Sequence, residues 1–97
     1  MPFVYALRSG TDDRFKIGRT SADPEARKRN LSTGNPNGLT VVAQIETDCD
    51  VLCETYLKRT LRTRRCPEGD ATEVFALSFE ELERAFADAR DFVQEYL

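Results

Sequence analysis

The most constraining feature of the sequence is a pair of short β-type segments near its start, joined by only five residues. Residues 3–8 are rich in aromatic and β-branched side chains, which favour strands. Residues 14–20 alternate, with Phe15 and Ile17 on one face and polar or small residues on the other. Because residues 9–13 are turn-forming and form a short polar connection, the sequence predicts a β-hairpin.

The rest of the chain predicts helices and further strands. Asp23 before Pro24 is typical of a helix start, and Ser78 with Glu81 has the spacing of a capping box. In chain order we expect a helix at about 24–32, a strand at 39–46, a helix from Asp48 or Asp50 to about 64, a segment at 73–77 that could add a short strand, and a helix at 78–96. This order predicts one α+β domain over residues 1–97, with a small, mainly antiparallel three-stranded sheet in a ββαβα core and a C-terminal amphipathic helix.

Both of the later helices have an apolar face. In the middle helix this face comprises Cys49, Leu52, Cys53, Tyr56, Leu57 and Leu61. In the last helix it comprises Phe79, Leu82, Phe86, Ala89 and Val93. The last helix is also strongly acidic. Its apolar stripe could pack into the core of the domain, or the helix could bind a protein partner.

Composition excludes several classes of function. Histidine is absent, which excludes Ser-His-Asp and Cys-His catalysis and histidine-ligated zinc. The three cysteines are an odd number, and none is spaced as a C-x-x-C pair, so we expect small buried apolar residues. The start of the chain lacks the pattern of a secretory signal, and no segment approaches the about 20 apolar residues of a membrane span. We therefore expect a cytoplasmic protein without a membrane partner.

The net charge of −3 conceals an uneven distribution of charge along the chain. Residues 1–66 contain twelve Lys and Arg against eight Asp and Glu, for a balance of +4. Residues 67–97 contain two basic and nine acidic residues, for a balance of −7. This division favours one surface for a polyanion and another that faces away from it. The alternative is an ordinary solvated face on the last helix.

Two side chains lie where helix packing alone does not require a charge. Arg27 is one turn before Leu31 on the inward-leaning face of its helix, so it could bind an anion or lay its stem across apolar surface. Glu54 lies at the border of an apolar helix face. It could pair with Lys58 on the surface, or it could project into a cleft and hold a divalent cation.

The second strand of the hairpin adds further candidates. Lys16 and Gly18 share the face opposite Phe15, and a glycine inside a strand often marks the close approach of another group. Lys16, Arg19 and Arg27 could then converge on an anion. Tyr5 lies in a strand with apolar residues on both faces, so the pattern leaves its direction open.

The ordered set of these residues resembles the GIY-YIG nuclease superfamily, in its small single-domain branch of phages and bacteria. Phe3-Val4-Tyr5 stands at the first tripeptide and Lys16-Ile17-Gly18 at the second, with ten residues between Tyr5 and Lys16. Residues 23–27, 31–36 and 52–57 are similar to the branch in order and spacing, and the similarity covers residues 3–77. Phe3 replaces the first glycine of the family motif, Lys16 the second tyrosine and Lys58 a histidine of the helix.

The resemblance implies a metal-dependent endonuclease that hydrolyses phosphodiester bonds in DNA. Glu54 would hold one Mg²⁺ or Mn²⁺, and Arg27 would bind the scissile phosphate. Tyr5 would orient or deprotonate the attacking water, and Lys16 would supply positive charge beside it. The expected catalytic residues are Tyr5, Lys16, Arg27 and Glu54, and the expected substrate-binding residues are Gly18, Arg19, Lys58, Arg64 and Arg65.

Two other functions remain open from the sequence. The same fold could be a nucleic-acid-binding module that has lost its cutting power, because a fold does not determine a function. Alternatively, the chain could be a small interaction protein that uses its acidic last helix. The basic residues near the end of the middle helix, Arg64 and Arg65 among them, could follow a phosphate backbone or could complement the C-terminal helix dipole.

Overall fold

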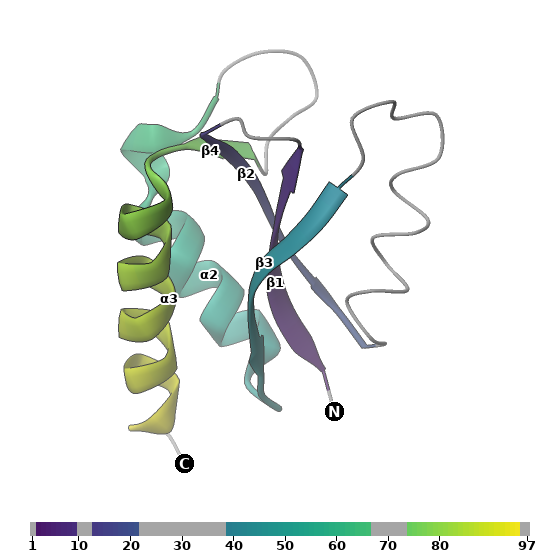
Figure 1. The fold of residues 1–97 in the computed structure, drawn as a ribbon. Helices are drawn as coiled ribbons and strands as arrows, with labels where there is room; N and C mark the ends of the chain where they lie inside the picture. The colour runs from purple at the N-terminus through teal and green to yellow at the C-terminus, as the bar shows by residue number, and fades with distance from the viewer. Residues whose placement is uncertain (1, 10–12, 22–38, 67–73, 96–97) are drawn as a thin grey trace.

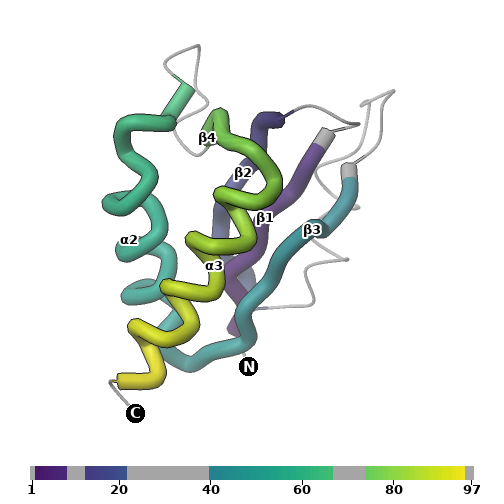
Figure 2. The backbone as a smooth tube through the Cα atoms, turned by 60° about the vertical axis from the view of Figure 1, so that its left-hand side comes forward, coloured from purple at the N-terminus to yellow at the C-terminus, as the bar shows by residue number. Residues whose placement is uncertain are grey.

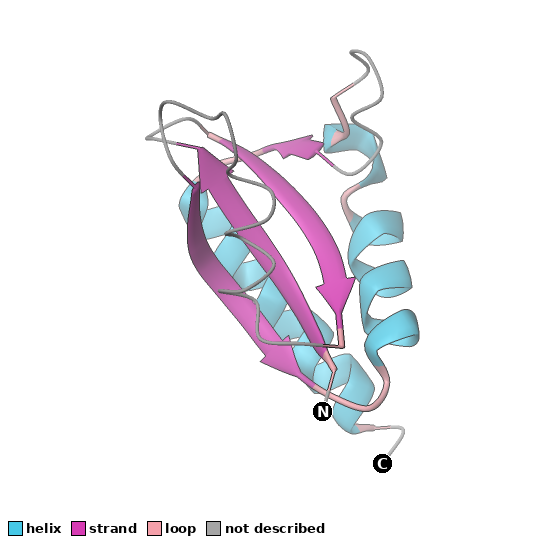
Figure 3. Cartoon of the chain, turned by 90° about the vertical axis from the view of Figure 1, so that its right-hand side faces the viewer, coloured by secondary structure: helices cyan, strands magenta, loops and turns pink. Residues whose placement is uncertain are grey.

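A computed structural model describes residues 2–9, 13–21, 39–66 and 74–95. They form a four-stranded antiparallel sheet with two helices on one face (Figures 1 and 3). The elements are β1 (Phe3–Ser9), β2 (Arg14–Thr20), β3 (Leu39–Glu46), α2 (Asp50–Thr60), a 3₁₀ turn (Arg62–Arg64), β4 (Val74–Ala76) and α3 (Phe79–Gln94). The α+β class expected from the sequence is confirmed.

The predicted hairpin is present and contributes the two inner strands of the sheet. The strand order is β3-β1-β2-β4, so β1 pairs on both sides. Across β1 and β2 the register places Tyr5 opposite Gly18 and Leu7 opposite Lys16. The pairing of β1 with β3 shifts by one residue after Ala6, which marks a β-bulge at this point.

The sheet has a fourth strand where the sequence predicted three. The segment at 73–77 does form the short strand that we considered possible, β4, which pairs with β2 only at Arg14, Phe15 and Lys16. Among the described strands, none pairs with the outer edge of β2 beyond Lys16. Within the described residues, the second half of β2 is therefore an open edge of the sheet.

The hydrophobic core lies between the sheet and the two helices. The alternation predicted for β2 is confirmed, since Phe15 and Ile17 are fully buried and belong to this core together with Val4 and Ala6 of β1. Tyr5 and Leu7 are also buried but do not belong to the same cluster. Because side chains alternate along a strand, Tyr5 and Leu7 point to the sheet face opposite the helices.

The last helix begins where the sequence predicted. The Ser78 hydroxyl accepts a hydrogen bond from the Glu81 backbone N–H, and the Glu81 carboxylate accepts one from the Ser78 N–H, which completes the capping box. The buried residues of α3 are Leu82, Ala85, Phe86, Ala89 and Val93. Tyr56 of α2 and Phe92 of α3 stack with ring centroids 4.3 Å apart, where the two helices lie side by side (Figure 2). This burial supports core packing for the apolar stripe of α3.

The middle helix differs from the prediction at both ends. Its N-cap is Cys49 and makes no side-chain capping bond, so the expectation that Asp48 or Asp50 caps this helix is wrong. The Thr47 hydroxyl instead accepts a hydrogen bond from the Cys49 N–H at 3.0 Å. The α-helix ends at Thr60, four residues before the expected end, and tightens into the 3₁₀ turn. Beyond Leu61 the chain is basic and exposed, so no apolar contact extends the helix.

Two other expectations concern helix 24–32 and the cysteines. The helix expected at about 24–32, including Arg27, lies outside the described residues.

All three cysteines are free thiols, and Cys53 is fully buried in the core, while Cys49 and Cys66 are partly buried.

Candidate functional site

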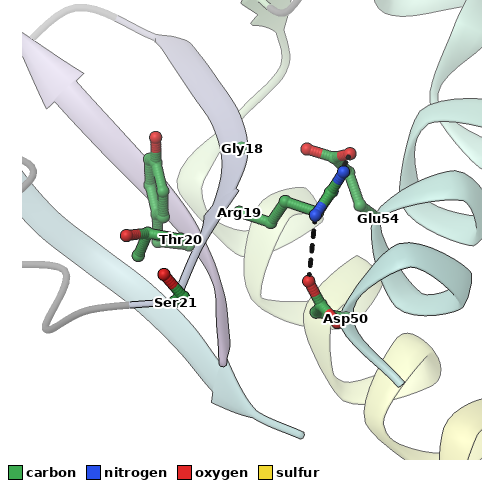
Figure 4. Close-up of a pocket in the computed structure, with 7 residues that line it drawn as sticks. Gly18, Arg19, Thr20, Ser21, Asp50 and Glu54 are labelled. Carbon is green, nitrogen blue, oxygen red and sulfur yellow. Dashed lines mark hydrogen bonds and ion pairs between the residues drawn. The ribbon is translucent and has the colours of Figure 1, made fainter. Parts of the chain in front are cut away.

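A polar pocket of about 510 Å³ opens at the C-terminal end of β2, beside the first two turns of α2 (Figure 4). Its lining residues are Tyr5, Gly18, Arg19, Thr20, Ser21, Asp50 and Glu54. The pocket lies at the part of the β2 edge that β4 does not cover. Residues from the hairpin and from α2, 30 or more positions apart in the chain, therefore line one pocket.

Tyr5 and Gly18 form the sheet side of the pocket, and they contact each other closely. They are directly opposite in the β1–β2 ladder, and the phenol of Tyr5 lies over Gly18. A β-carbon at position 18 would lie only 2.7 Å from the Tyr5 hydroxyl oxygen. The absence of a side chain at Gly18 therefore provides the space for the Tyr5 hydroxyl. The sequence predicted that another group would closely approach this strand glycine, and that group is the phenol of Tyr5.

Arg19 connects the strand to the helix through two carboxylates. Its Nη1 lies 3.2 Å from Asp50 Oδ2, and its Nε lies 3.4 Å from Glu54 Oε1 (Figure 4). The side chains of Asp50 and Glu54 are each 16% exposed, whereas that of Arg19 is 48% exposed. The guanidinium thus bridges two half-buried acids from the open side of the pocket.

Glu54 has a second cationic neighbour. Lys58 Nζ lies 3.4 Å from Glu54 Oε2, which is the i,i+4 pair considered from the sequence. The sequence posed this pair and a cleft-lining role as alternatives, and the structure has both, since Glu54 pairs with Lys58 and also lines the pocket. One carboxylate oxygen faces Arg19 and the other faces Lys58.

The other candidates from the sequence lie apart from this pocket. Lys16 is half-buried on β2, two residues before Gly18 on the same strand face, and is not among the lining residues. Arg64 pairs with the Glu81 carboxylate of α3, and Arg65 is exposed after the 3₁₀ turn. Lys16 and Arg19 point to opposite faces of β2, because their positions differ by an odd number. Within the described residues, those two cations therefore do not converge on one anion.

The pocket has two carboxylates that could hold a small divalent cation. Asp50 and Glu54 are four residues apart on one helix face, and Tyr5 lines the same pocket. Carboxylates suit Mg²⁺ and Mn²⁺, and Mg²⁺ commonly takes one or two of them while it keeps several waters. No group of three or more His, Cys, Asp or Glu side chains that could hold a metal ion occurs among the described residues. The protein would therefore supply one or two carboxylates, with Glu54 and Asp50 as the candidates.

Sequence reasoning missed Asp50 as a pocket residue and considered it only as a helix cap. The signal was available, because Asp50 and Glu54 are four residues apart and such residues share a helix face. Thr20 and Ser21 were missed as well, and nothing local to the sequence marks them as lining residues. The pairing of Arg19 with Asp50 spans 31 positions and depends on how α2 packs against the sheet.

Comparison with known families decides the classification of this chain. The T5orf172 domain family matches residues 2–90, which is nearly the whole sequence. The chain belongs to the T5orf172 domain family. This family is nuclease-related, and membership indicates a nuclease-like or DNA-binding role. The sequence matches no curated protein and no solved structure. In the described part of the T5orf172 domain, no helix is long and apolar enough to cross a membrane.

Proposed function

We propose that this T5orf172 domain is a metal-dependent endonuclease of the GIY-YIG type that hydrolyses phosphodiester bonds in DNA. The observation that supports this most directly is that Tyr5, Gly18 and Glu54 all line one pocket at the edge of β2, Tyr5 from the sheet face opposite the helices and Glu54 from α2. These three residues come from three of the motif segments that resemble the nuclease superfamily. Their convergence on one polar pocket is what a hydrolytic site requires, and packing of the core does not require it.

Each of these residues has a distinct task in the proposed reaction. Glu54, with Asp50 one turn away, would hold one Mg²⁺ or Mn²⁺, which supplies positive charge for the phosphate oxygens when bound. The Tyr5 hydroxyl would orient the attacking water or accept its proton. Gly18 would leave room for that hydroxyl at its present position, since a β-carbon on residue 18 would collide with it. Lys16 would add positive charge on the same sheet face as Tyr5.

The remaining contacts to DNA would come from arginines. Arg27, which lies outside the described residues, is the proposed ligand of the scissile phosphate, because a guanidinium binds phosphate oxygens bidentately. Arg64 and Arg65, beyond the end of α2, would contact the phosphate backbone without reading its sequence. Both are exposed, and Arg64 would exchange its surface ion pair with Glu81 for a phosphate.

A cleavage assay tests the chemistry. The full chain is incubated with single- and double-stranded DNA and RNA in the presence of Mg²⁺, Mn²⁺ or EDTA. We expect metal-dependent cleavage of DNA that Glu54→Gln and Tyr5→Phe each reduce at least a hundredfold. Glu83→Gln, on the exposed face of α3, is the matched control and should cut like the parent protein. Cleavage that survives both EDTA and Glu54→Gln would refute the proposed mechanism.

A binding assay tests the DNA contacts separately. Replacing Arg64 and Arg65 with glutamate should weaken DNA binding to a similar degree for all sequences and reduce the salt dependence of the affinity. Arg84→Glu on α3 serves as the control for a surface charge reversal. Unchanged binding of the double variant at low salt would remove the two arginines from the DNA interface.

A nucleic-acid-binding module without cutting activity is the second candidate. The observation that favours it is the pairing of Glu54 with both Arg19 and Lys58, which already neutralises the proposed metal ligand. The same two assays distinguish the candidates, since a pure binding module would bind DNA with a salt-dependent affinity and cut none of the substrates.

A further inference from the structure

The cation that holds Asp50 and Glu54 together is Arg19, and it occupies the side of both carboxylates that faces the pocket. Its two contacts, at 3.2 and 3.4 Å, use one oxygen of each acid. Asp50 and Glu54 bring two negative charges, and Arg19 and Lys58 return two positive ones. The four side chains are therefore electrically balanced without any bound ion.

A divalent cation at this site would change that balance. Two positive charges added beside the carboxylates would repel the guanidinium, which faces the same oxygen atoms. Arg19 and a divalent ion are therefore competitors for Glu54 Oε1 and Asp50 Oδ2.

Of the two cations, Arg19 is the one that can leave toward the pocket. Its side chain is 48% exposed and lines the pocket, whereas Lys58 is 29% exposed and does not line it. Lys58 also pairs with Glu54 within one helix, at the favourable i,i+4 spacing. Arg19 instead crosses from the β2 edge, and no described strand pairs with this part of that edge.

We propose that Arg19 is an exchangeable cation that occupies the Asp50–Glu54 site in the metal-free protein and leaves it when a divalent ion binds. The displaced guanidinium remains at the mouth of the pocket, where it can bind a phosphate of the DNA. This inference rests on the proposed function, because it takes Glu54 as a metal ligand. It adds that metal and DNA bind cooperatively through Arg19.

The cooperativity follows from linkage. If metal binding frees Arg19 for a phosphate, then DNA binding to Arg19 must strengthen metal binding by the same factor. Without DNA, the arginine weakens the metal site. With DNA, the arginine is held elsewhere and the site becomes available. The pocket would therefore bind its metal preferentially when a substrate is present.

The first test measures Mn²⁺ affinity without DNA, by calorimetry, in the full chain. Arg19→Gln should bind Mn²⁺ at least tenfold more tightly than the parent protein. Arg62→Gln removes the same charge from an exposed position in the 3₁₀ turn and should change the affinity less than about twofold. An affinity that is unchanged or weaker in Arg19→Gln, or that rises equally in the control, would overturn the proposal.

Failure of the proposed function is distinguishable from failure of the exchange. Glu54→Gln should abolish Mn²⁺ binding, and normal binding by this variant would refute the metal site itself. If binding does depend on Glu54 but does not respond to Arg19→Gln, the site stands and the exchange is wrong.

The second test measures the coupling between metal and DNA. In a Tyr5→Phe background, expected to suppress cleavage, DNA affinity is measured by fluorescence anisotropy with Mn²⁺ and with EDTA. Mn²⁺ should raise the affinity several-fold more when Arg19 is present than in the Tyr5→Phe, Arg19→Gln double variant. An equal effect of Mn²⁺ in both proteins would show that Arg19 does not couple the two ligands.

Discussion

The contact between Gly18 and Tyr5 allows a sharp prediction for Gly18→Ala. The new β-carbon would lie 2.7 Å from the Tyr5 hydroxyl oxygen and 3.0 Å from the ring carbon that bears it. The optimal separation of such atoms is about 3.5–4.0 Å, so the ring or the strand must move. Tyr5 is only 2% exposed, so a shift of its ring would disturb the atoms packed around it.

The size of the effect follows from two opposing terms. Overpacking of this kind costs about 1–3 kcal/mol. Replacement of glycine by alanine also restricts the unfolded chain, which returns about 0.4–1 kcal/mol. The difference between these terms is about 0–2.6 kcal/mol, and because the 2.7 Å contact is a severe overlap we expect Gly18→Ala to lower the free energy of unfolding by about 1–2 kcal/mol. For a domain of this size, the midpoint of thermal unfolding would fall by roughly 5–15 °C.

The assay is urea unfolding followed by far-UV circular dichroism, and Tyr5→Phe provides the internal control. That substitution removes the oxygen of the 2.7 Å contact and leaves the ring in place. Gly18→Ala should therefore cost at least 0.5 kcal/mol less in the Tyr5→Phe background, as a coupling energy of contacting residues. The same cost in both backgrounds, or a Gly18→Ala variant as stable as the parent protein, would refute the steric argument.

Four further predictions concern α3 and the core. Ser78→Ala should lower the free energy of unfolding by about 1 kcal/mol, measured by urea unfolding, because it removes one half of the capping box. The hydrogen bond from the Ser78 backbone N–H lowers the pKa of the Glu81 carboxyl. The ionised carboxylate therefore stabilises the folded protein above the ordinary pKa of 4.5, and this contribution is lost as the pH falls through the lowered pKa. Glu81→Gln should accordingly flatten the acid limb of a plot of unfolding free energy against pH. Burial raises the pKa of the Cys53 thiol from 9.0 to about 11, so this thiol should resist alkylation at pH 8 while the two partly buried cysteines react. The contribution of the neutral thiol to the free energy of unfolding should be complete below pH 9 and lost as the pH rises toward 11. Rapid labelling of all three cysteines in the native protein would contradict this prediction. Phe86→Ala should cost about 3–5 kcal/mol, and a variant that keeps its thermal midpoint would instead favour a partner-binding role for α3.

The sequence predicted those parts of the fold that depend on local pattern. The alternation of Phe15 and Ile17 identified β2, because a strand repeats every two residues and one face of it is buried. The Ser78 capping box identified the start of α3, because its hydrogen bonds span only three residues. Both patterns are complete within a single element, so no knowledge of the packing is needed.

The errors arose where one element meets another. Asp50 was expected as a possible helix cap, but its carboxylate pairs with Arg19 across the sheet–helix boundary. The basic segment after Leu61 was expected to continue the helix to about residue 64. The α-helix ended earlier because that segment buries nothing. Tyr5, Gly18 and Glu54 of the pocket could be nominated from the motif segments, whereas Thr20, Ser21 and the direction of Arg19 could not.

The double pairing of β1 has a consequence for how this protein can change. Val4 and Ala6 face the helices while Tyr5 points the other way, so a slip of one residue in β1 would exchange core and pocket side chains at once. Substitutions that alter the register of β1 would therefore cost stability before they could alter activity. We expect the amide hydrogens of β1 to exchange with solvent only on global unfolding. Functional variation should accumulate instead at the exposed rim of the pocket, for which Ser21 is the clearest candidate.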